Sequence, residues 1–271
     1  MKTPRDAWNG ALWSVGTLVF LFIYVPLLVV IAYSFHTESI IAWPLRLGTL
    51  RWYGVLSQDR GMLSAALASV KLALLAVAIA LGIGVPGAFV LDRFDFPGKE
   101  AFRKLVLLPL ILPGIITGVA LLSYFSFLGV SLSSGFPVIP GWPVVIGHGA
   151  ALTSVVITQV FARLQRFDRA LEEASADLYA NEWQTFWHVT LPTIRSAVLG
   201  AALLVFTLSL DEIAVTFFLI GRQNTLPLQI WGLLRRGITP EVNAAATVIF
   251  AVSLVVIVVW ARLVDEGTRS S

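Results

Sequence analysis

The chain has no cysteine among its 271 residues, and only 13% of them are charged, against about 25% in soluble domains. The absence of cysteine excludes disulfides, zinc sites built on thiolates and thiol catalysis. The shortage of charge excludes an ordinary soluble domain. Instead, 57% of the residues are hydrophobic and nine are tryptophan, which is typical of a protein that lies in lipid.

Motifs for nucleotide, nucleic-acid and metal binding are also missing. No G-x-x-x-x-G-K-[ST] occurs, so we expect no ATP site and no other cofactor in this chain. The basic residues are scattered, which gives nucleic-acid binding no support. His36, His148 and His188 lie in separate segments without metal-ligand spacing, so we expect no metal site and interpret His148 as a core or interface residue. No nucleophile with a nearby base is recognisable, which predicts no catalytic residue.

Long uncharged runs predict membrane-spanning helices. The run 105–162 carries no charge and is too long for one crossing, so the segment 131–143, rich in proline and glycine, must contain a turn. We therefore expect an all-α, polytopic membrane protein in one domain, residues 1–271. Its six predicted helices lie at about 11–33, 65–91, 105–130, 144–162, 197–220 and 242–261.

The distribution of lysine and arginine predicts the orientation of these helices. Six crossings put both termini on the same side of the membrane. That side would carry about twice as many lysines and arginines as the other. The positive-inside rule therefore predicts that both termini lie in the cytosol.

The one hydrophilic stretch long enough to fold is 163–192, on the predicted cytosolic side. Steps of three and four residues predict one amphipathic helix, with an apolar stripe of Leu164, Phe167, Leu171, Ala174 and Leu178. Such a helix either lies on lipid headgroups or docks a cytosolic partner, and its acidic residues argue mildly against an anionic lipid surface. Of these acids, Glu172 and Asp177 either pair with arginines or cap the helix, or else belong to a solvated face.

Two acidic residues interrupt the predicted helix 197–220. Asp211 and Glu212 lie where a charge costs about 2.5–3.5 kcal/mol on insertion scales, so each needs a partner or a water-filled path. At helical spacing Thr207 and Val215 share a face with Asp211, whereas the two acids point about 100° apart. The pair suits a translocation path for a cation, and the alternative is a structural ion pair with an arginine of another helix or subunit.

The loop sequence EEASADLYANEWQTFWHVTLP resembles the cytoplasmic loop of ABC importer permeases. In that family the loop has Glu-Ala-Ala, three residues, glycine, nine residues, isoleucine, one residue and Leu-Pro. The matching positions here are Glu173, Ala174, Ser175, Val189, Leu191 and Pro192. Tyr179 stands where the family has its glycine, at the bend between two short coupling helices. The resemblance extends over nearly the whole chain.

Within that family the chain is similar to the second permease subunit of spermidine/putrescine importers, as shown by TLSLDEIAVTFFLIG (207–221), TLPLQIWGLLRRGITPEVNAAAT (225–247) and RWYGVL (51–56). The resemblance implies a six-helix, MetI-like permease that is not an enzyme, in the bacterial cytoplasmic membrane. It implies a second, homologous permease as partner and two copies of an ATPase that binds ATP and Mg. It also implies an extracytoplasmic binding protein that delivers the solute.

Pattern and resemblance together predict two sites. The expected ATPase-coupling residues are Glu172, Glu173, Ala174, Ser175, Asp177, Leu178, Tyr179, Leu191 and Pro192. The expected translocation path contains Asp211, Glu212, Thr207 and Val215.

The solute and the transport class leave alternatives. Polyamine permeases often have an acid directly after a proline of the third helix, whereas Gly114 follows Pro113 here. Importers of phosphonate, opine, thiamine and ferric ion therefore remain alternatives. A secondary transporter would share the intramembrane acids, but the inverted repeats and matched broken helices of that class are not visible in the sequence. An integral-membrane enzyme would need a catalytic cluster, and none is visible.

Overall fold

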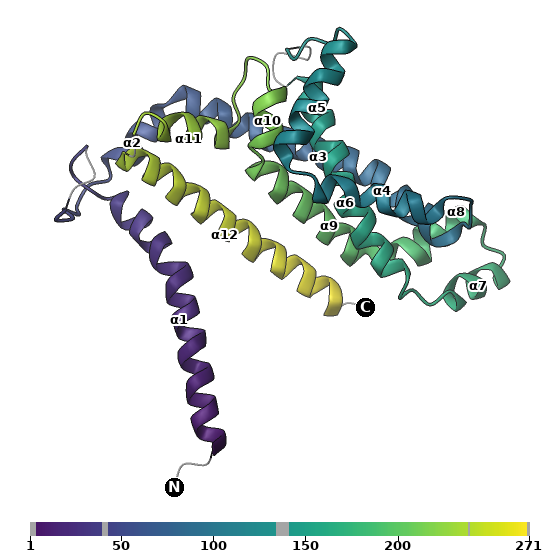
Figure 1. The fold of residues 1–271 in the computed structure, drawn as a ribbon. Coiled ribbons are helices and arrows are strands. Elements are labelled where there is room, and N and C mark those ends of the chain that lie inside the picture. Colours follow the sequence, from purple (N-terminus) through teal and green to yellow (C-terminus); the bar gives the residue numbers. More distant parts are fainter. Residues whose placement is uncertain (1–3, 40–42, 134–140, 238, 270–271) are drawn as a thin grey trace. The chain divides into compact units, whose positions relative to one another are not determined.

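The computed structural model describes residues 4–39, 43–133, 141–237 and 239–269, and the regular elements of these residues are helices (Figure 1). The chain divides into two compact units. One unit comprises residues 1–60 with 230–271, and the other comprises residues 61–229. That the whole chain acts as one permease domain stays a prediction.

The helices that lie wholly within the described residues of the first unit are α1 (Pro4–Tyr33), α2 (Arg51–Gln58) and α12 (Pro240–Arg269). Helix α12 packs against both α1 and α2. The loop after α1 is organised around the buried side chain of His36, whose Nδ1 accepts a hydrogen bond from the Arg46 amide at 3.1 Å. The Trp52 indole donates to the His36 carbonyl at 2.7 Å, which ties this loop to α2.

The second unit contains most of the buried core. Its helices are α3 (Arg60–Arg93), α4 (Lys99–Ile111), α5 (Gly114–Phe127), α6 (Trp142–Leu164), α7 (Ala170–Asp177), α8 (Glu182–Thr185), the π-helix η1 (Phe186–Thr190), α9 (Leu191–Asp211) and α10 (Ala214–Leu219). Helix α11 (Leu226–Leu234) contains the boundary between the units.

Helix α6 is the centre of the second unit, and it packs against α4, α5, α9 and α10 (Figure 1). Small residues let its neighbours approach closely. A Cβ atom on Gly84 of α3 would lie 2.6 Å from the Val156 Cβ of α6, so this helix pair requires glycine at position 84. Figure 1 shows α7 and α8 at one end of this unit and α5 with α10 toward the other.

The prediction of one continuous helix is wrong for two segments, because each segment contains a break. The predicted helix 105–130 is two helices, α4 and α5, bent by 106° at Leu112 and Pro113. Proline has no N–H to donate and disfavours a helical conformation in the preceding residue, so the bend falls there. The predicted helix 197–220 begins earlier, in a helical stretch from Glu182, and ends at Asp211 before α10 begins.

Four helical segments of the described chain are long and apolar enough to cross a membrane, namely Leu12–Tyr33, Arg60–Arg93, Trp142–Leu164 and Glu182–Asp211. The bent pair α4 and α5 makes a fifth if it counts as one span, and the apolar part of α12, Pro240–Val255, is shorter. The all-α, multi-pass architecture is therefore confirmed, whereas the count of six spans is not.

Candidate functional site

The loop 163–192 does not form the single amphipathic helix that its periodicity predicted. Helix α6 ends at Leu164 and α7 begins at Ala170, because the Asp168 carboxylate accepts the Ala170 amide at 3.0 Å and starts a new helix. The predicted stripe is therefore divided. Leu164 and Phe167 are buried in the bundle, whereas Leu171 and Ala174 of α7 and Leu178 directly after it are exposed.

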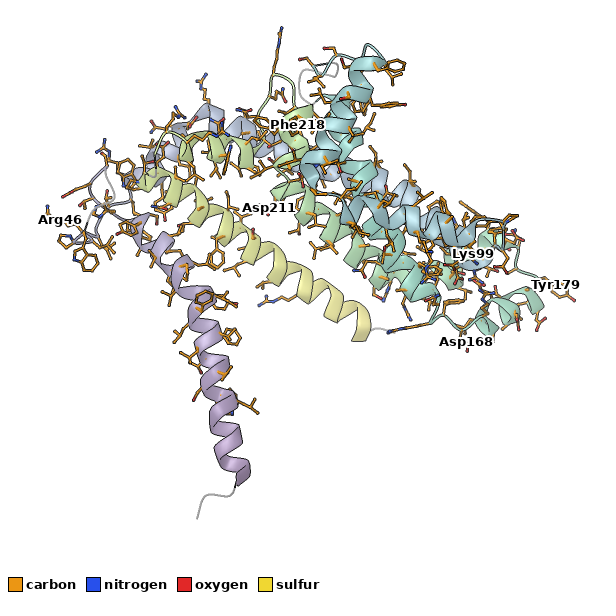
Figure 2. The ribbon with its side chains drawn as sticks, viewed as in Figure 1. Arg46, Lys99, Asp168, Tyr179, Asp211 and Phe218 are labelled. Atoms are coloured by element: carbon orange, nitrogen blue, oxygen red, sulfur yellow. The ribbon has the colours of Figure 1, made fainter. Side chains whose placement is uncertain are left out.

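Tyr179 closes α7 in the conformation that normally requires glycine. Its φ is +62°, and its amide donates to the Ala176 carbonyl at 2.9 Å, while the Ala180 amide reaches back to Ser175 at 3.2 Å. These two bonds form a Schellman motif, which ends a helix by satisfying its last carbonyls. The bend is thus kept without glycine, and the Tyr179 side chain, 98% exposed, projects from the tip of the loop (Figure 2).

The chain after this bend is helical up to Asp211. Asn181 caps α8, because its side chain accepts the Gln184 amide while the Gln184 side chain accepts the Asn181 amide. The helix then passes Pro192, which has no N–H, through the π-helical residues of η1. Leu191 is partly buried against the core of α3, α6 and α9.

Glu172 is the most tightly bound acid of the loop. Its Oε2 lies 2.7 Å from Arg93 Nη1, and its Oε1 accepts hydrogen bonds from Arg93 Nη2 at 2.8 Å and from the Thr190 hydroxyl at 2.6 Å. Of the two interpretations of this acid, the structure therefore shows the ion pair. Asp177 is exposed and has no partner among the described residues, so it belongs to a solvated face of this chain.

Asp92 joins Glu172 and Arg93 in one polar cluster, and no sequence pattern had singled it out. Its side chain is only 7% exposed, and its Oδ2 lies 3.3 Å from Arg169 Nη2 and 3.4 Å from Arg93 Nε. Nearby, Lys99 donates to the exposed Asp95 carboxylate at 2.9 Å, and this hydrogen bond holds the pKa of Asp95 below its usual value. Alternating charges thus gather where α3 ends and α4 begins.

The two intramembrane acids have different surroundings. Asp211 is the last residue of α9, it is exposed, and its carboxylate has no hydrogen-bond or ion-pair partner among the described residues (Figure 2). Glu212 is extended and half-buried, and its Oε1 accepts the Val215 amide at 2.8 Å, which caps α10. Thr207 is exposed on α9, but Val215 is 4% exposed in the core. The predicted common face of Asp211 and Val215 is therefore wrong, because the helix breaks between them.

His148 spans this break from α6. Its Nδ1 lies 2.8 Å from the Ser209 hydroxyl before the break, and its Nε2 lies 2.8 Å from the Thr216 hydroxyl after it. Because the Thr216 hydroxyl donates to the Glu212 carbonyl at 2.8 Å, it accepts from His148 Nε2, and Nδ1 accepts from Ser209. The interpretation of His148 as a core residue is confirmed, and its partners hold α9 and α10 in register.

The two helix breaks lie side by side, because α5 packs on α10. A Cβ atom on Gly114 would lie 3.1 Å from the Ala214 Cβ and 3.5 Å from Glu212 Oε1, and one on Gly118 would lie 2.8 Å from Phe218. Glycine at these positions allows the close approach. Two helix breaks that the sequence did not reveal are therefore present, one within the bent pair α4 and α5 and one at the end of the span Glu182–Asp211.

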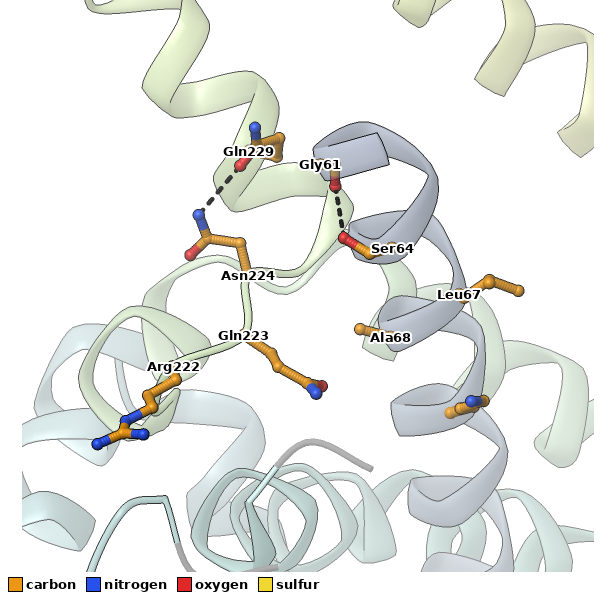
Figure 3. Close-up of a pocket in the computed structure, with 9 residues that line it drawn as sticks. Gly61, Ser64, Leu67, Ala68, Arg222, Gln223, Asn224 and Gln229 are labelled. Carbon is orange, nitrogen blue, oxygen red and sulfur yellow. Dashed lines mark hydrogen bonds between the residues drawn. The ribbon is translucent and has the colours of Figure 1, made fainter. Parts of the chain in front are cut away.

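A polar hollow of about 470 Å³ lies at the other end of α3 (Figure 3). It is lined by Gly61, Ser64, Leu67, Ala68, Lys71, Arg222, Gln223, Asn224 and Gln229. Its two charged lining residues are both cationic. Helix α3 has 34 residues and is about 50 Å long, so this hollow and the Glu172 cluster lie at opposite ends of it.

The protein family described as binding-protein-dependent transport system inner membrane component matches residues 84–270. This chain belongs to that family. The permease is 35% identical over 264 residues to the putrescine transport system permease protein PotI of Escherichia coli strain K12. This match covers 96% of this chain and 92% of the relative. It is 33% identical over 243 residues to the spermidine/putrescine transport system permease protein PotC of Haemophilus influenzae, with coverages of 89% and 91%.

A solved structure shows the same fold. It is a bacterial alginate ABC transporter in complex with an alginate pentasaccharide-bound periplasmic protein. The TM-score is 0.69 at 17% identity, and the match covers 95% of the permease and 93% of that chain. The family match and the two permease relatives confirm the resemblance to ABC importer permeases, and these relatives are transport permeases and not enzymes.

Proposed function

We propose that this permease forms the translocation path of an ATP-driven importer for a small polyamine such as putrescine or spermidine. The observation that carries the proposal is the carboxylate of Asp211, which lies at the end of α9 with no partner in the part of the chain that the structure describes. The carbonyls at this helix end carry the negative pole of the helix dipole and add to the negative charge. An ammonium group in a partly dehydrated path is attracted by both, because the effective dielectric constant is lower there than in water.

Of the two acids, Asp211 is the better candidate for the cation. Glu212 already accepts an amide of α10, and its geometry is fixed by that bond. The hollow at the outer end of α3 is a poor site for a polyamine, because Lys71 and Arg222 repel it. The named substrates of the relatives, putrescine and spermidine, agree with a carboxylate in the path.

The coupling loop would dock the ATPase through α7 and the bend after it. Leu178 is 82% exposed and Tyr179 is 98% exposed, and Glu173 and Ala174 lie on the same short helix. Exposed apolar side chains of this size favour a protein partner that removes them from water. ATP and Mg would be bound by that partner, a pair of ATPase subunits, and not by this chain.

The remaining partners are proposed from the resemblance to the family. A second, homologous permease would complete the translocation path, and both termini of this chain would lie in the cytosol with the coupling loop. A binding protein would deliver the polyamine from the opposite side of the membrane. The family description supports this last partner, because it names transport as dependent on a binding protein.

The proposal is tested by purifying the tagged permease from cells that express the genes encoded beside it. We expect an ATPase and a second permease to copurify with the tagged chain. Membrane vesicles from the same cells should take up polyamine. Unlabelled putrescine should compete for this uptake, whereas phosphonate, opine, thiamine and ferric ion should not. Efficient competition by one of those four solutes would overturn the polyamine assignment, and the absence of any ATPase would overturn the coupling assignment.

A further inference from the structure

We propose that Glu172 is the positioning residue that connects the coupling helix α7 to the membrane helices, through Arg93 on α3 and Thr190 before α9. The inference rests on the proposed function in one respect, namely that an ATPase docks on α7. It goes further by assigning to Glu172 a role inside this chain, so that Glu172 passes on the movement of α7 and does not contact the ATPase.

Helix α7 has almost no apolar attachment to the rest of the chain. None of its residues is buried, and Leu171 and Ala174 are exposed, as is Leu178 directly after the helix. A short helix without buried side chains is not held by the hydrophobic effect. Its position therefore depends on polar contacts, of which Ser175 with Thr185 at 3.0 Å joins α7 only to the next short helix.

Glu172 is the α7 side chain that reaches both membrane helices. Arg93 is the last residue of α3, and Thr190 is the residue directly before α9. The two Arg93 bonds to separate oxygens of Glu172 fix direction as well as distance. The side chains of Glu172 and Arg93 are about four-fifths buried, so water screens their attraction less than that of a surface pair.

Arg93 is itself held in place from behind. Its Nε lies 3.4 Å from Asp92, its guanidinium lies 5.8 Å from the Phe167 ring, and Asp92 also pairs with Arg169 directly before α7. Two arginines and two carboxylates balance in charge, so the cluster is stable without an external ion. A displacement of Glu172 therefore moves the end of α3 and is not absorbed by rotation of a free arginine.

A second feature gives α7 room to move about this contact. A hollow of about 420 Å³ separates α7 from the bundle, and its lining includes Phe89, Ala176, Ala180 and Phe186. Glu172, Arg93 and Thr190 lie at its wall. From Thr190 the chain continues through α9 without interruption to Asp211, so one rigid element joins the cluster to the proposed cation site.

The main test is Glu172→Gln in the complete complex, with Glu100→Gln as the matched control. Glu100 is an exposed acid of α4, near the same end of α3. We expect Glu172→Gln to keep the ATPase bound and hydrolysing, whereas the amount of putrescine carried per ATP falls about tenfold. The control should carry the same amount per ATP as the unaltered complex.

A double-mutant cycle with Arg93→Gln separates a shared role from two structural ones. If Glu172 and Arg93 act through each other, the amount of putrescine carried per ATP falls no further in the double variant than in either single variant, because one substitution already breaks the contact. If they act independently, the losses multiply to about 100-fold, and the inference is overturned.

Thr190→Val gives a second test if Glu172→Gln fails to accumulate in the membrane. It removes one bond of Glu172 and keeps the shape, and we expect a loss of about threefold in putrescine per ATP. An unchanged ratio in this variant would overturn the inference, as would release of the ATPase by Glu172→Gln. If the unaltered complex shows no ATP-dependent uptake, the proposed function fails and the inference fails with it. Normal coupling in Glu172→Gln overturns the inference but leaves the proposed function standing.

Discussion

Glu172 and Asp211 are both acids of α-helices that follow α6, but their surroundings are opposite. Glu172 has three close contacts, two from Arg93 and one from Thr190. Asp211 has none among the residues that the structure describes, although it lies at the end of a membrane-spanning segment. A compensated acid is explained by this chain alone, whereas an uncompensated acid in a membrane requires something from outside the chain, namely the water of a path, a partner subunit or a cargo.

Glu212 lies between these two extremes, directly next to Asp211. Its Oε1 accepts a hydrogen bond from the Val215 amide, and its backbone carbonyl accepts one from the Thr216 hydroxyl. The two adjacent acids thus differ: Glu212 stabilises the helix break by its hydrogen bonds, whereas Asp211 lies exposed beside the break.

The largest expected effect concerns the docking part of the loop, and it separates docking from positioning. Ala174→Arg places an unpaired charge in the proposed ATPase interface, so we expect at least about 100-fold weaker ATPase binding. Because Ala174 is exposed in this chain, membrane abundance should stay normal. Copurification of the ATPase with the tagged variant is the measurement, and unimpaired coupled transport would show that α7 is not the docking surface.

Asp211→Asn has the next largest expected effect. It keeps the shape of the side chain and removes its charge, so uptake of a polyamine should fall about 10- to 100-fold, the range for losing a charged hydrogen bond. Asp95→Asn, at an exposed carboxylate between α3 and α4, is the matched control.

The alternative to a cargo site predicts a different order of effects for Asp211→Asn. If Asp211 pairs with an arginine of the partner subunit, removing its charge leaves that arginine unpaired and lowers the abundance of the complex first. Uptake and abundance measured on the same vesicles therefore decide between the two. Full uptake at normal abundance would contradict both.

His148→Ala tests the framework that holds the two acids apart. The change leaves the Ser209 and Thr216 hydroxyls without their buried partner, which costs about 1–3 kcal/mol for an unsatisfied group. Thermal unfolding in detergent should show the loss. His188→Ala, at an exposed histidine of η1, is the control, and equal stability of the two variants would mean that His148 does not hold the break.

Tyr179→Gly has the smallest expected effect, because two contributions oppose each other. Glycine relieves the left-handed conformation by about 1 kcal/mol, but removal of the exposed ring weakens ATPase binding by about 1–3 kcal/mol if the ring packs into the partner. ATPase retention at raised salt is the measurement. Tyr179→Phe should retain the ATPase, and equal retention by both variants would rule out ring packing.

Elements with clear ends were predictable from the sequence. The predicted helices 65–91 and 144–162 lie within α3 and α6, because charges or prolines flank their apolar runs. The bend at Tyr179 was predictable from the family spacing alone, since tyrosine itself disfavours that conformation.

Other features depend on residues that are distant in the chain. The break after Asp211 contains no proline or glycine, and it is stabilised by His148, which lies more than 60 residues earlier. Arg93 and Glu172 are 79 residues apart, and nothing in either segment indicates the other. The break at Pro113 was missed because the uncharged run around this proline predicted one continuous span.

The most direct test of the account is uptake of labelled putrescine into proteoliposomes that contain the complete complex and its binding protein. ATP is supplied on one side of the membrane at a time, and ion gradients are collapsed. The account predicts that putrescine accumulates only when ATP is on the side of the coupling loop, and that Asp211→Asn abolishes most of this accumulation. In a parallel sample without ATP but with an imposed ion gradient, accumulation of putrescine would contradict it.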